Sequence, residues 1–211
     1  MNYMTPIRLN NKGAELLSQG RAREARVLIA KALNLTKLIT VEKWKLPMDN
    51  ARNDKCPAVE YLWLERVSLS TLPHTFIYRR PIQIIENPEF ADRRSLAAHF
   101  TTAIIFNVSL AFHIEGLQSS RLLHKAMHGY RIALGLRKHK RRTKSTVLDM
   151  ALLNNMASIY EEQSDYSGAQ RYFMNLVLVM KHQDKDELDS IDVDGFTDSA
   201  MWRQPSCAPV A

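Results

Sequence analysis

The chain has 211 residues, of which 45% are hydrophobic and 24% are charged, and its formal net charge is +7 at pH 7. These proportions are ordinary for a globular protein, and the scarcity of glycine (7) and proline (8) favours helix. The two cysteines, Cys56 and Cys207, lie far apart and form neither a CxxC pair nor a disulfide framework, which argues for a reducing compartment.

No apolar run approaches the roughly 18 residues that a membrane-spanning helix needs, and the N-terminus lacks the apolar core of a signal peptide. We therefore expect an intracellular protein without membrane insertion, located in the cytoplasm or, as an alternative, in the nucleus. Length and one plausible core predict a single domain over residues 1–183. Residues 184–211 are acidic and lose periodicity, which predicts a mostly disordered tail.

The first elements expected are two helices, over residues 5–20 and 22–38. Thr5 can cap the first helix, and Pro6 suits the first helical position. Gly20 can end this helix in the left-handed conformation. The two helices make a first unit over residues 6–38.

Residues 39–91 follow no helical period and contain five prolines. Two apolar patches look extended, one around residues 60–68 and the other over residues 75–78, which residues 81–84 follow across Arg79 and Arg80. They can pair as a short β-hairpin, which Pro81 confines to a sheet edge because proline donates no backbone hydrogen bond. The insertion is either ordered and packed on the helices or a flexible loop. We favour the ordered alternative, since the patches are too apolar to leave in water.

Two further helices are expected over residues 92–114 and 119–136, with Asp92 and Ser119 as caps, and they contain a second unit over residues 101–136. The clearest unit covers residues 148–180, in which Ser164 and Asp165 break two runs of apolar residues at helical spacing. Helix pairs this short cannot bury both apolar faces alone and must stack on their neighbours. The pattern predicts an all-α solenoid of about three helix-turn-helix pairs.

The small and aromatic residues of the third unit carry a family resemblance. The spacing of these residues resembles that of a tetratricopeptide (TPR) repeat, and they are Ala157, Tyr160, Ala169 and Phe173. The sequence of the unit is most similar to the kinesin-light-chain subtype of this repeat. The first unit matches through Asn11, Gly13, Leu16, Gly20, Ala25 and Ala32. The second unit resembles the family less closely. About five extra residues between Gly116 and Ala126 either lengthen the corner or start the second helix a turn early.

The resemblance places Asn11, Asn107 and Asn155 at equivalent positions on the first helix of each unit, facing a concave groove. An amide can donate to and accept from the backbone of an extended peptide. Asparagine is also common at this position in the repeat and can bond locally, so both interpretations stay open. The function expected is a non-catalytic scaffold that binds a protein or peptide partner in this groove. The sequence predicts neither the identity of the partner nor the oligomeric state.

The alternative function comes from the charge pattern. Residues 116–148 contain nine Lys or Arg and no acid, whereas residues 184–198 contain seven acids and one Lys. The densest basic strip comprises Arg137, Lys138, Lys140, Arg141, Arg142 and Lys144. It can be a solvated linker, a nuclear-import signal, or a contact for nucleic acid or another polyanion. The alternative is therefore a basic helical scaffold that binds a polyanion.

Catalytic and metal-binding motifs give no support for other functions. His124 and His128 have the spacing of zinc ligands on a helix, but Lys125 stands where a hydrolytic HExxH motif needs Glu. Residues 190–201 imitate a calcium loop but have Ser190 and Met201 at the two end positions that require acids. No nucleophile elbow or phosphate-binding glycine loop is present. We expect no enzyme activity, no cofactor and no metal.

Overall fold

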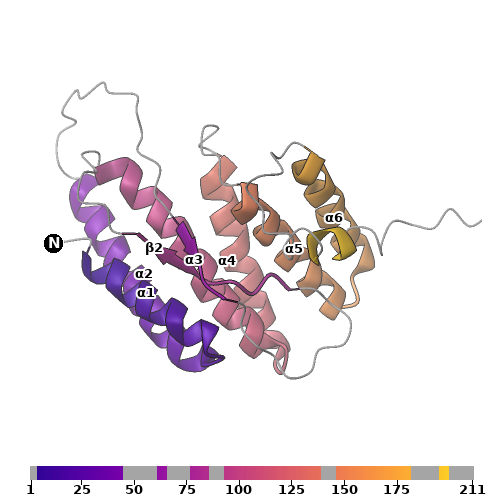
Figure 1. Cartoon of the computed structure of the whole chain (residues 1–211), viewed down its shortest axis with the longest axis horizontal. Helices are drawn as coiled ribbons and strands as arrows, with labels where there is room; N and C mark the ends of the chain where they lie inside the picture. Colours follow the sequence, from indigo (N-terminus) through magenta and orange to yellow (C-terminus); the bar gives the residue numbers. More distant parts are fainter. Residues whose placement is uncertain are drawn as a thin grey trace, which may run out of the picture. The chain divides into compact units, whose positions relative to one another are not determined.

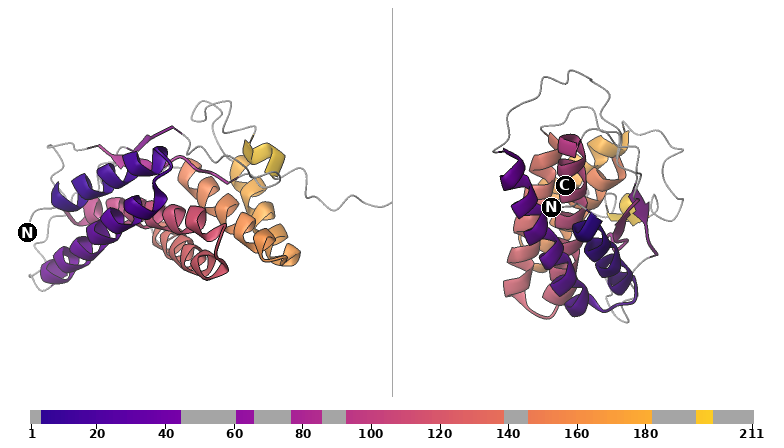
Figure 2. Two further views of the ribbon diagram at one scale, coloured as in Figure 1. Left: turned by 90° about the horizontal axis from the view of Figure 1, so that it is seen from below. Right: turned by 90° about the vertical axis from the view of Figure 1, so that its left-hand side faces the viewer.

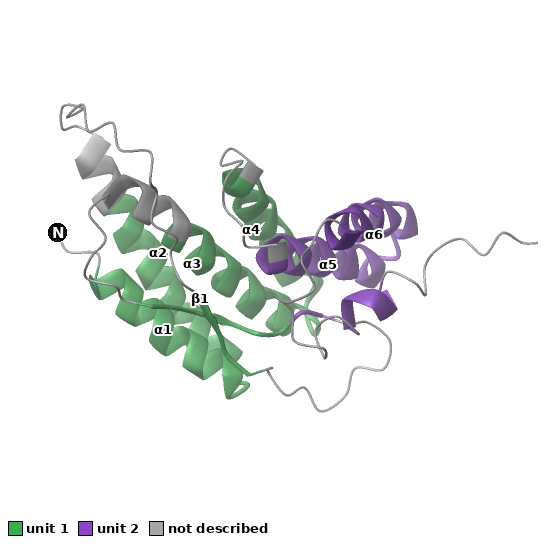
Figure 3. Cartoon of the chain, turned by 45° about the horizontal axis from the view of Figure 1, so that its top comes forward, with its two compact units in different colours: residues 1–68, 79–141 green, residues 69–78, 142–211 purple. Residues whose placement is uncertain are grey.

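The computed structural model describes residues 4–44, 61–65, 77–85, 93–138, 146–181 and 195–199. Over this part of the chain the protein is largely helical, as predicted, with helices paired in sequence order and a small two-stranded sheet between the second and third helices (Figure 1). The chain divides into two compact units, where the sequence predicts one domain (Figure 3). Unit 1 comprises residues 1–68 and 79–141, and unit 2 comprises residues 69–78 and 142–211.

Unit 1 contains two helix pairs, α1 (Met4–Ser18) with α2 (Ala22–Trp44), and α3 (Arg93–Gly116) with α4 (Ser120–Lys138). Helices α1 and α2 lie side by side as a helical hairpin, and α2 also packs on α3 (Figure 2). Small residues bring the helices close together. A Cβ atom on Gly13 would collide with the Ile29 side chain, and one on Gly129 would collide with Ser109.

The connection between α1 and α2 ends the first helix as predicted. Gly20 has φ = 78°, the left-handed conformation that glycine adopts without steric cost. Its N–H donates to the carbonyl of Leu17 at 2.9 Å, and the N–H of Arg21 donates to that of Leu16 at 2.9 Å. These two bonds satisfy carbonyls that the helix end would otherwise leave without partners.

Unit 2 contains the helix pair α5 (Thr146–Glu162) and α6 (Tyr166–Lys181). Ser164, with φ = 58°, takes the place that Gly20 has in unit 1. Asp165 caps α6, because its Oδ1 accepts from the N–H of Gly168 at 2.9 Å and from the Ser167 hydroxyl at 3.0 Å. The Gly168 bond, followed by the Ser167 bond, lowers the pKa of the Asp165 carboxyl.

The extra residues of the second helix pair lengthen both of its helices, and its corner remains three residues long. Helix α3 ends nine residues after Asn107, two more than α1 and α5 extend past their equivalent asparagines. Helix α4 begins six residues before Ala126, whereas α2 and α6 begin three residues before Ala25 and Ala169. The earlier start of the second helix, one of the two predicted alternatives, therefore accounts for most of the difference.

The sheet joins the first extended patch, around residues 60–68, to the segment that follows Arg79 and Arg80. Strand β1 (Tyr61–Trp63) pairs antiparallel with β2 (Ile82–Ile84), and Leu62 lies opposite Gln83. The N–H of Leu64 donates to the carbonyl of Pro81 at 2.9 Å, which continues the pairing by one bond. The side chains of Ile82 and Ile84 are buried, so β2 belongs to the core of unit 1.

Several expected boundaries differ from the structure. Helix α1 begins at Met4, so Thr5 lies within its first turn, and α2 continues six residues past Leu38 to Trp44. Residues 195–199, within the tail expected to be mostly disordered, form a helical turn whose Phe196 is buried in unit 2. Residues 184–194 and 200–211 of that tail lie outside the described residues. None of the described helices is long and apolar enough to cross a membrane.

Candidate functional site

In unit 1, two asparagines expected to face a groove hold the main chain of β2. The Oδ1 atom of Asn107 accepts from the N–H of Ile82 at 2.9 Å, and its Nδ2 donates to the carbonyl of the same residue at 2.7 Å. Asn11 makes the same pair of bonds to Ile84, at 2.8 Å to the N–H and 2.9 Å to the carbonyl. Each amide thus holds both polar groups of one residue, and we call this arrangement an asparagine clamp.

A third clamp lies in unit 2. The Oδ1 atom of Asn155 accepts from the N–H of Tyr78 at 2.7 Å, and its Nδ2 donates to the carbonyl of Tyr78 at 3.0 Å. Asn155 is fully buried, and so is Asn107 in unit 1. A buried amide costs free energy unless its donor and acceptor find partners. The extended backbone supplies both partners here.

The clamps and β1 hold alternate residues of β2. In an antiparallel pair, successive residues point their N–H and C=O groups toward opposite edges of the strand. Pro81 and Gln83 face β1, through the bond from Leu64 and the pairing with Leu62. Ile82 and Ile84 turn theirs to the asparagines of α3 and α1. Side chains of the helices therefore replace a third strand along the second edge of β2.

Asn10, which the repeat pattern does not single out, strengthens the unit 1 site. Its Nδ2 donates to the carbonyl of Ile82 at 3.1 Å, and its Oδ1 accepts from Nδ2 of Asn107 at 2.9 Å. Asn10 is fully buried on the stripe of α1 that also contains Ile7 and Ala14. A polar residue on an apolar helical stripe was the available signal, because such a position requires a hydrogen-bond partner.

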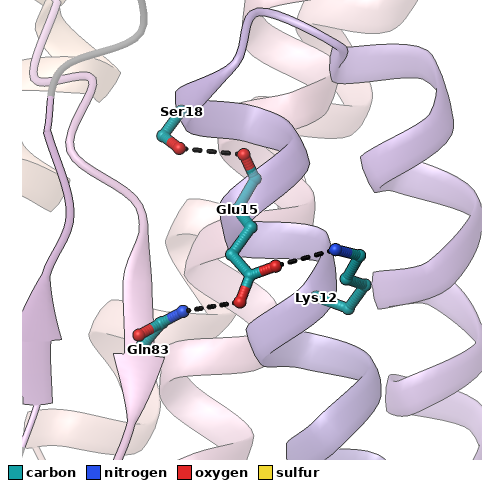
Figure 4. A network of polar contacts seen from close by, with 4 residues as sticks. All are labelled: Lys12, Glu15, Ser18 and Gln83. Atoms are coloured by element: carbon teal, nitrogen blue, oxygen red, sulfur yellow. Dashed lines mark hydrogen bonds and ion pairs between the residues drawn. The ribbon is translucent and has the colours of Figure 1, made fainter.

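Side-chain contacts attach β2 and β1 further to unit 1. The Glu15 carboxylate accepts from Nε2 of Gln83 at 3.3 Å and pairs with Lys12 at 2.9 Å (Figure 4). The Trp63 ring packs edge-on against Phe106, with centroids 5.8 Å apart. Gln83 and Glu15 are partly exposed, so we assign these bonds less stabilisation than the buried clamps.

In unit 2, the residue held by the clamp also makes an aromatic contact. The Tyr78 ring stacks on Phe196 at a centroid distance of 5.0 Å and an interplanar angle of 12°. Both rings are buried. The acidic region near the C-terminus therefore contributes a core residue beside the third clamp, a contact that the sequence analysis did not anticipate.

The basic strip is described at its first two residues alone. Arg137 is 9% exposed near the end of α4, so its side chain does not belong to a solvated strip. Lys138 ends that helix, while Lys140, Arg141, Arg142 and Lys144 lie outside the described residues. The buried Arg137 is a correction to the expectation of an exposed strip beginning at this residue.

The histidines with zinc-ligand spacing, His124 and His128, are both exposed on α4. Within the described ranges, no group of three or more His, Cys, Asp or Glu residues gathers as a metal site. Of the calcium-like stretch, residues 195–199 adopt the helical turn that carries Phe196, and residues 190–194 are not described. These residues give no positive support to either metal site.

His113 on α3 is a buried titratable group. Its Nδ1 lies 3.4 Å from the Tyr130 hydroxyl, and its buried Nε2 has no hydrogen-bond partner among the described residues. Burial lowers the pKa of His113 to about 3, because the charged imidazolium would lose its hydration. His113 is therefore neutral in the folded protein near pH 7.

No protein-family model, no curated protein and no solved structure matches the chain. We therefore infer function from the contacts of the described residues.

Proposed function

We propose that this protein is a non-catalytic interaction module of the TPR type that binds an extended peptide through its asparagine clamps. The observation that carries the proposal is a repeated pair of bonds: Asn11 and Asn107 in unit 1, and Asn155 in unit 2, each hold the main chain of one extended residue. Equivalent positions on three helices make the same bonds, which supports a repeated binding device.

The chemistry of the clamps favours peptide binding. A main-chain N–H and C=O of one extended residue match the acceptor and donors of an amide. Strand-addition sites likewise gain affinity from main-chain bonds and select alternate side chains through pockets. The clamps would therefore accept extended backbones in general and choose among them by the side chains that become buried.

The polyanion-binding alternative depends on the basic residues between α4 and α5. It predicts different behaviour in salt, because each neutralised phosphate releases counterions. Peptide binding through neutral amides and apolar side chains should change little between 0.1 and 0.5 M salt. Binding dominated by phosphate contacts should weaken at least about tenfold over that range.

The test replaces residues 77–85 of the full chain with a Gly/Ser linker of equal length, which leaves the clamps without their internal occupant. Circular dichroism checks that the helices persist. We expect this variant to enrich peptides from a displayed random library. The same background with Asn11→Ala, Asn107→Ala and Asn155→Ala together should abolish the enrichment. Asn34 is exposed on α2, so Asn34→Ala is the matched control and should leave the enrichment of peptides unchanged.

A folded linker variant that enriches no peptide would contradict the proposal. Enrichment that survives Asn11→Ala, Asn107→Ala and Asn155→Ala together would also contradict it, because binding would then occur elsewhere. If the linker variant does not fold, Ile84→Ala takes its place, since it weakens the internal occupant without removing it.

A further inference from the structure

We propose that β2 is a ligand built into the chain. It occupies the unit 1 clamps in cis, and the external partner of this site is an extended peptide with two aliphatic residues separated by one residue, which competes with β2. This inference depends on the proposed function and adds to it the class of partner and the competitor.

The first supporting observation is that the clamps bind main-chain atoms alone. Every bond from Asn10, Asn11 and Asn107 to β2 ends on a backbone atom of Ile82 or Ile84. No side chain of β2 takes part in these bonds. Any extended segment presents the same groups at the same spacing, so the clamps do not distinguish β2 from another peptide.

The second support is the side-chain pattern of β2. Ile82 and Ile84 are 0% and 2% exposed, Gln83 between them is partly exposed, and Ile85 after them is 42% exposed. Alternate residues of a strand point to opposite faces, so a competing peptide buries residues two apart. Aliphatic side chains at those two positions, with any residue between them, would fill the space that Ile82 and Ile84 fill.

The third support is the limited pairing between β1 and β2. Each strand has three residues, and a two-stranded hairpin of that size is marginal without further packing. Pro81, the residue before β2, accepts from Leu64 but has no N–H to donate in return. The position of β2 therefore depends mainly on the helices, as the position of a bound peptide does.

The clamps also disfavour a vacant site. Removing β2 would take the main-chain partners from Asn10 and Asn107 and leave the bond between the two amides. Unpaired buried polar groups are costly, so exchange of β2 for a second peptide is favoured over simple release. An external peptide must also compete with the effective concentration of the tethered segment, on the order of millimolar for a short flexible connection.

The experiment uses a fluorescent synthetic peptide of residues 77–85 and measures its binding to the full chain by anisotropy. We expect Ile84→Ala, which weakens β2 in cis, to bind the peptide at least about tenfold more tightly than the unsubstituted chain. The exposed Ile85→Ala is the matched control and should bind as the unsubstituted chain does. A peptide with serine in place of both Ile82 and Ile84 should not bind.

Equal affinities for the unsubstituted chain and Ile84→Ala would show that the peptide does not compete with β2, and would overturn the inference. Binding of the serine peptide as tightly as the isoleucine peptide would overturn the partner class. If the linker variant enriches library peptides while folded Ile84→Ala does not bind this peptide, the inference fails and the proposed function stands. If the linker variant also enriches none, the proposed function fails. Ile84→Val replaces Ile84→Ala if the latter does not fold.

Discussion

The clamps of the two units use the same chemistry with different support. In unit 1, Asn10, Asn11 and Asn107 hold a strand whose other edge pairs with β1. In unit 2, one amide makes both bonds to Tyr78, and the ring of that residue stacks on Phe196. The same pair of main-chain bonds therefore holds residues with buried aliphatic side chains in unit 1 and a residue with a stacked aromatic ring in unit 2.

The largest expected effect is the stability lost when the asparagine of one clamp in each unit is replaced by alanine. Asn155→Ala removes both amide bonds to Tyr78. Asn107→Ala leaves the Ile82 carbonyl bonded to Asn10, but it removes the acceptor of the Ile82 N–H and the donor to Asn10 Oδ1. We expect each substitution to lower the free energy of unfolding by about 2–3 kcal/mol. Urea denaturation measures both losses. Hydrogen exchange at the Tyr78 and Ile82 amides should report which contact is lost.

The exposed Asn34→Ala serves as the control, with an expected change within about 0.5 kcal/mol. Undiminished protection of the Ile82 amide in Asn107→Ala, or of the Tyr78 amide in Asn155→Ala, would mean that the clamp in question does not hold the segment in solution.

The fold was predictable from the sequence because each helix pair carries a similar pattern of apolar and small residues at helical spacing. The three asparagines were also placed at equivalent positions by that repeat. The occupant of the clamps was not predictable, since Asn11 and Asn155 bond to residues that are 73 and 77 positions away and lie in an insertion without periodicity. Nothing in a local pattern sets the path of such a segment. Asn10 was detectable in principle as a polar residue on an apolar stripe.

Acid should weaken unit 1 through His113. The pKa of His113 is about 3 in the fold, below the ordinary value of 6.5, so the unfolded state binds a proton first as pH falls. The stability that the neutral ring contributes is complete above about pH 6.5 and is lost as pH falls toward 3. We expect this group to account for about 2 kcal/mol of the stability lost between pH 7 and 5.

The measurement compares urea denaturation at pH 7 and pH 5 for the unsubstituted chain and for His113→Gln. The variant should lose less stability between the two pH values, whatever its stability at pH 7. His124→Gln, at an exposed position of α4, should keep the full pH dependence. Hydrogen exchange should show α3 losing protection before α5. Identical pH dependence in His113→Gln and the unsubstituted chain would exclude His113 as the source.

The smallest expected effect tests whether the corners of the two units are equivalent. Ser164 has φ = 58° where unit 1 has Gly20 with φ = 78°. A non-glycine residue in this region costs about 1–2 kcal/mol, and the greater freedom of glycine in the unfolded chain offsets about half of that. We expect Ser164→Gly to stabilise the protein by about 0.5–1 kcal/mol and Gly20→Ser to destabilise it by a similar amount.

Thermal and urea denaturation measure the stability of Ser164→Gly and Gly20→Ser relative to the unsubstituted chain. Gln163→Gly is the matched control, because Gln163 is one residue earlier and does not have positive φ among the described residues, so glycine there should destabilise. The N–H groups of Ser164 and Asp165 donate to the carbonyls of Glu161 and Tyr160, as the equivalent groups do in unit 1. If Ser164→Gly were destabilising, the serine side chain would stabilise its corner through a contact of its own. The two corners would then have the same backbone conformation, stabilised by different interactions.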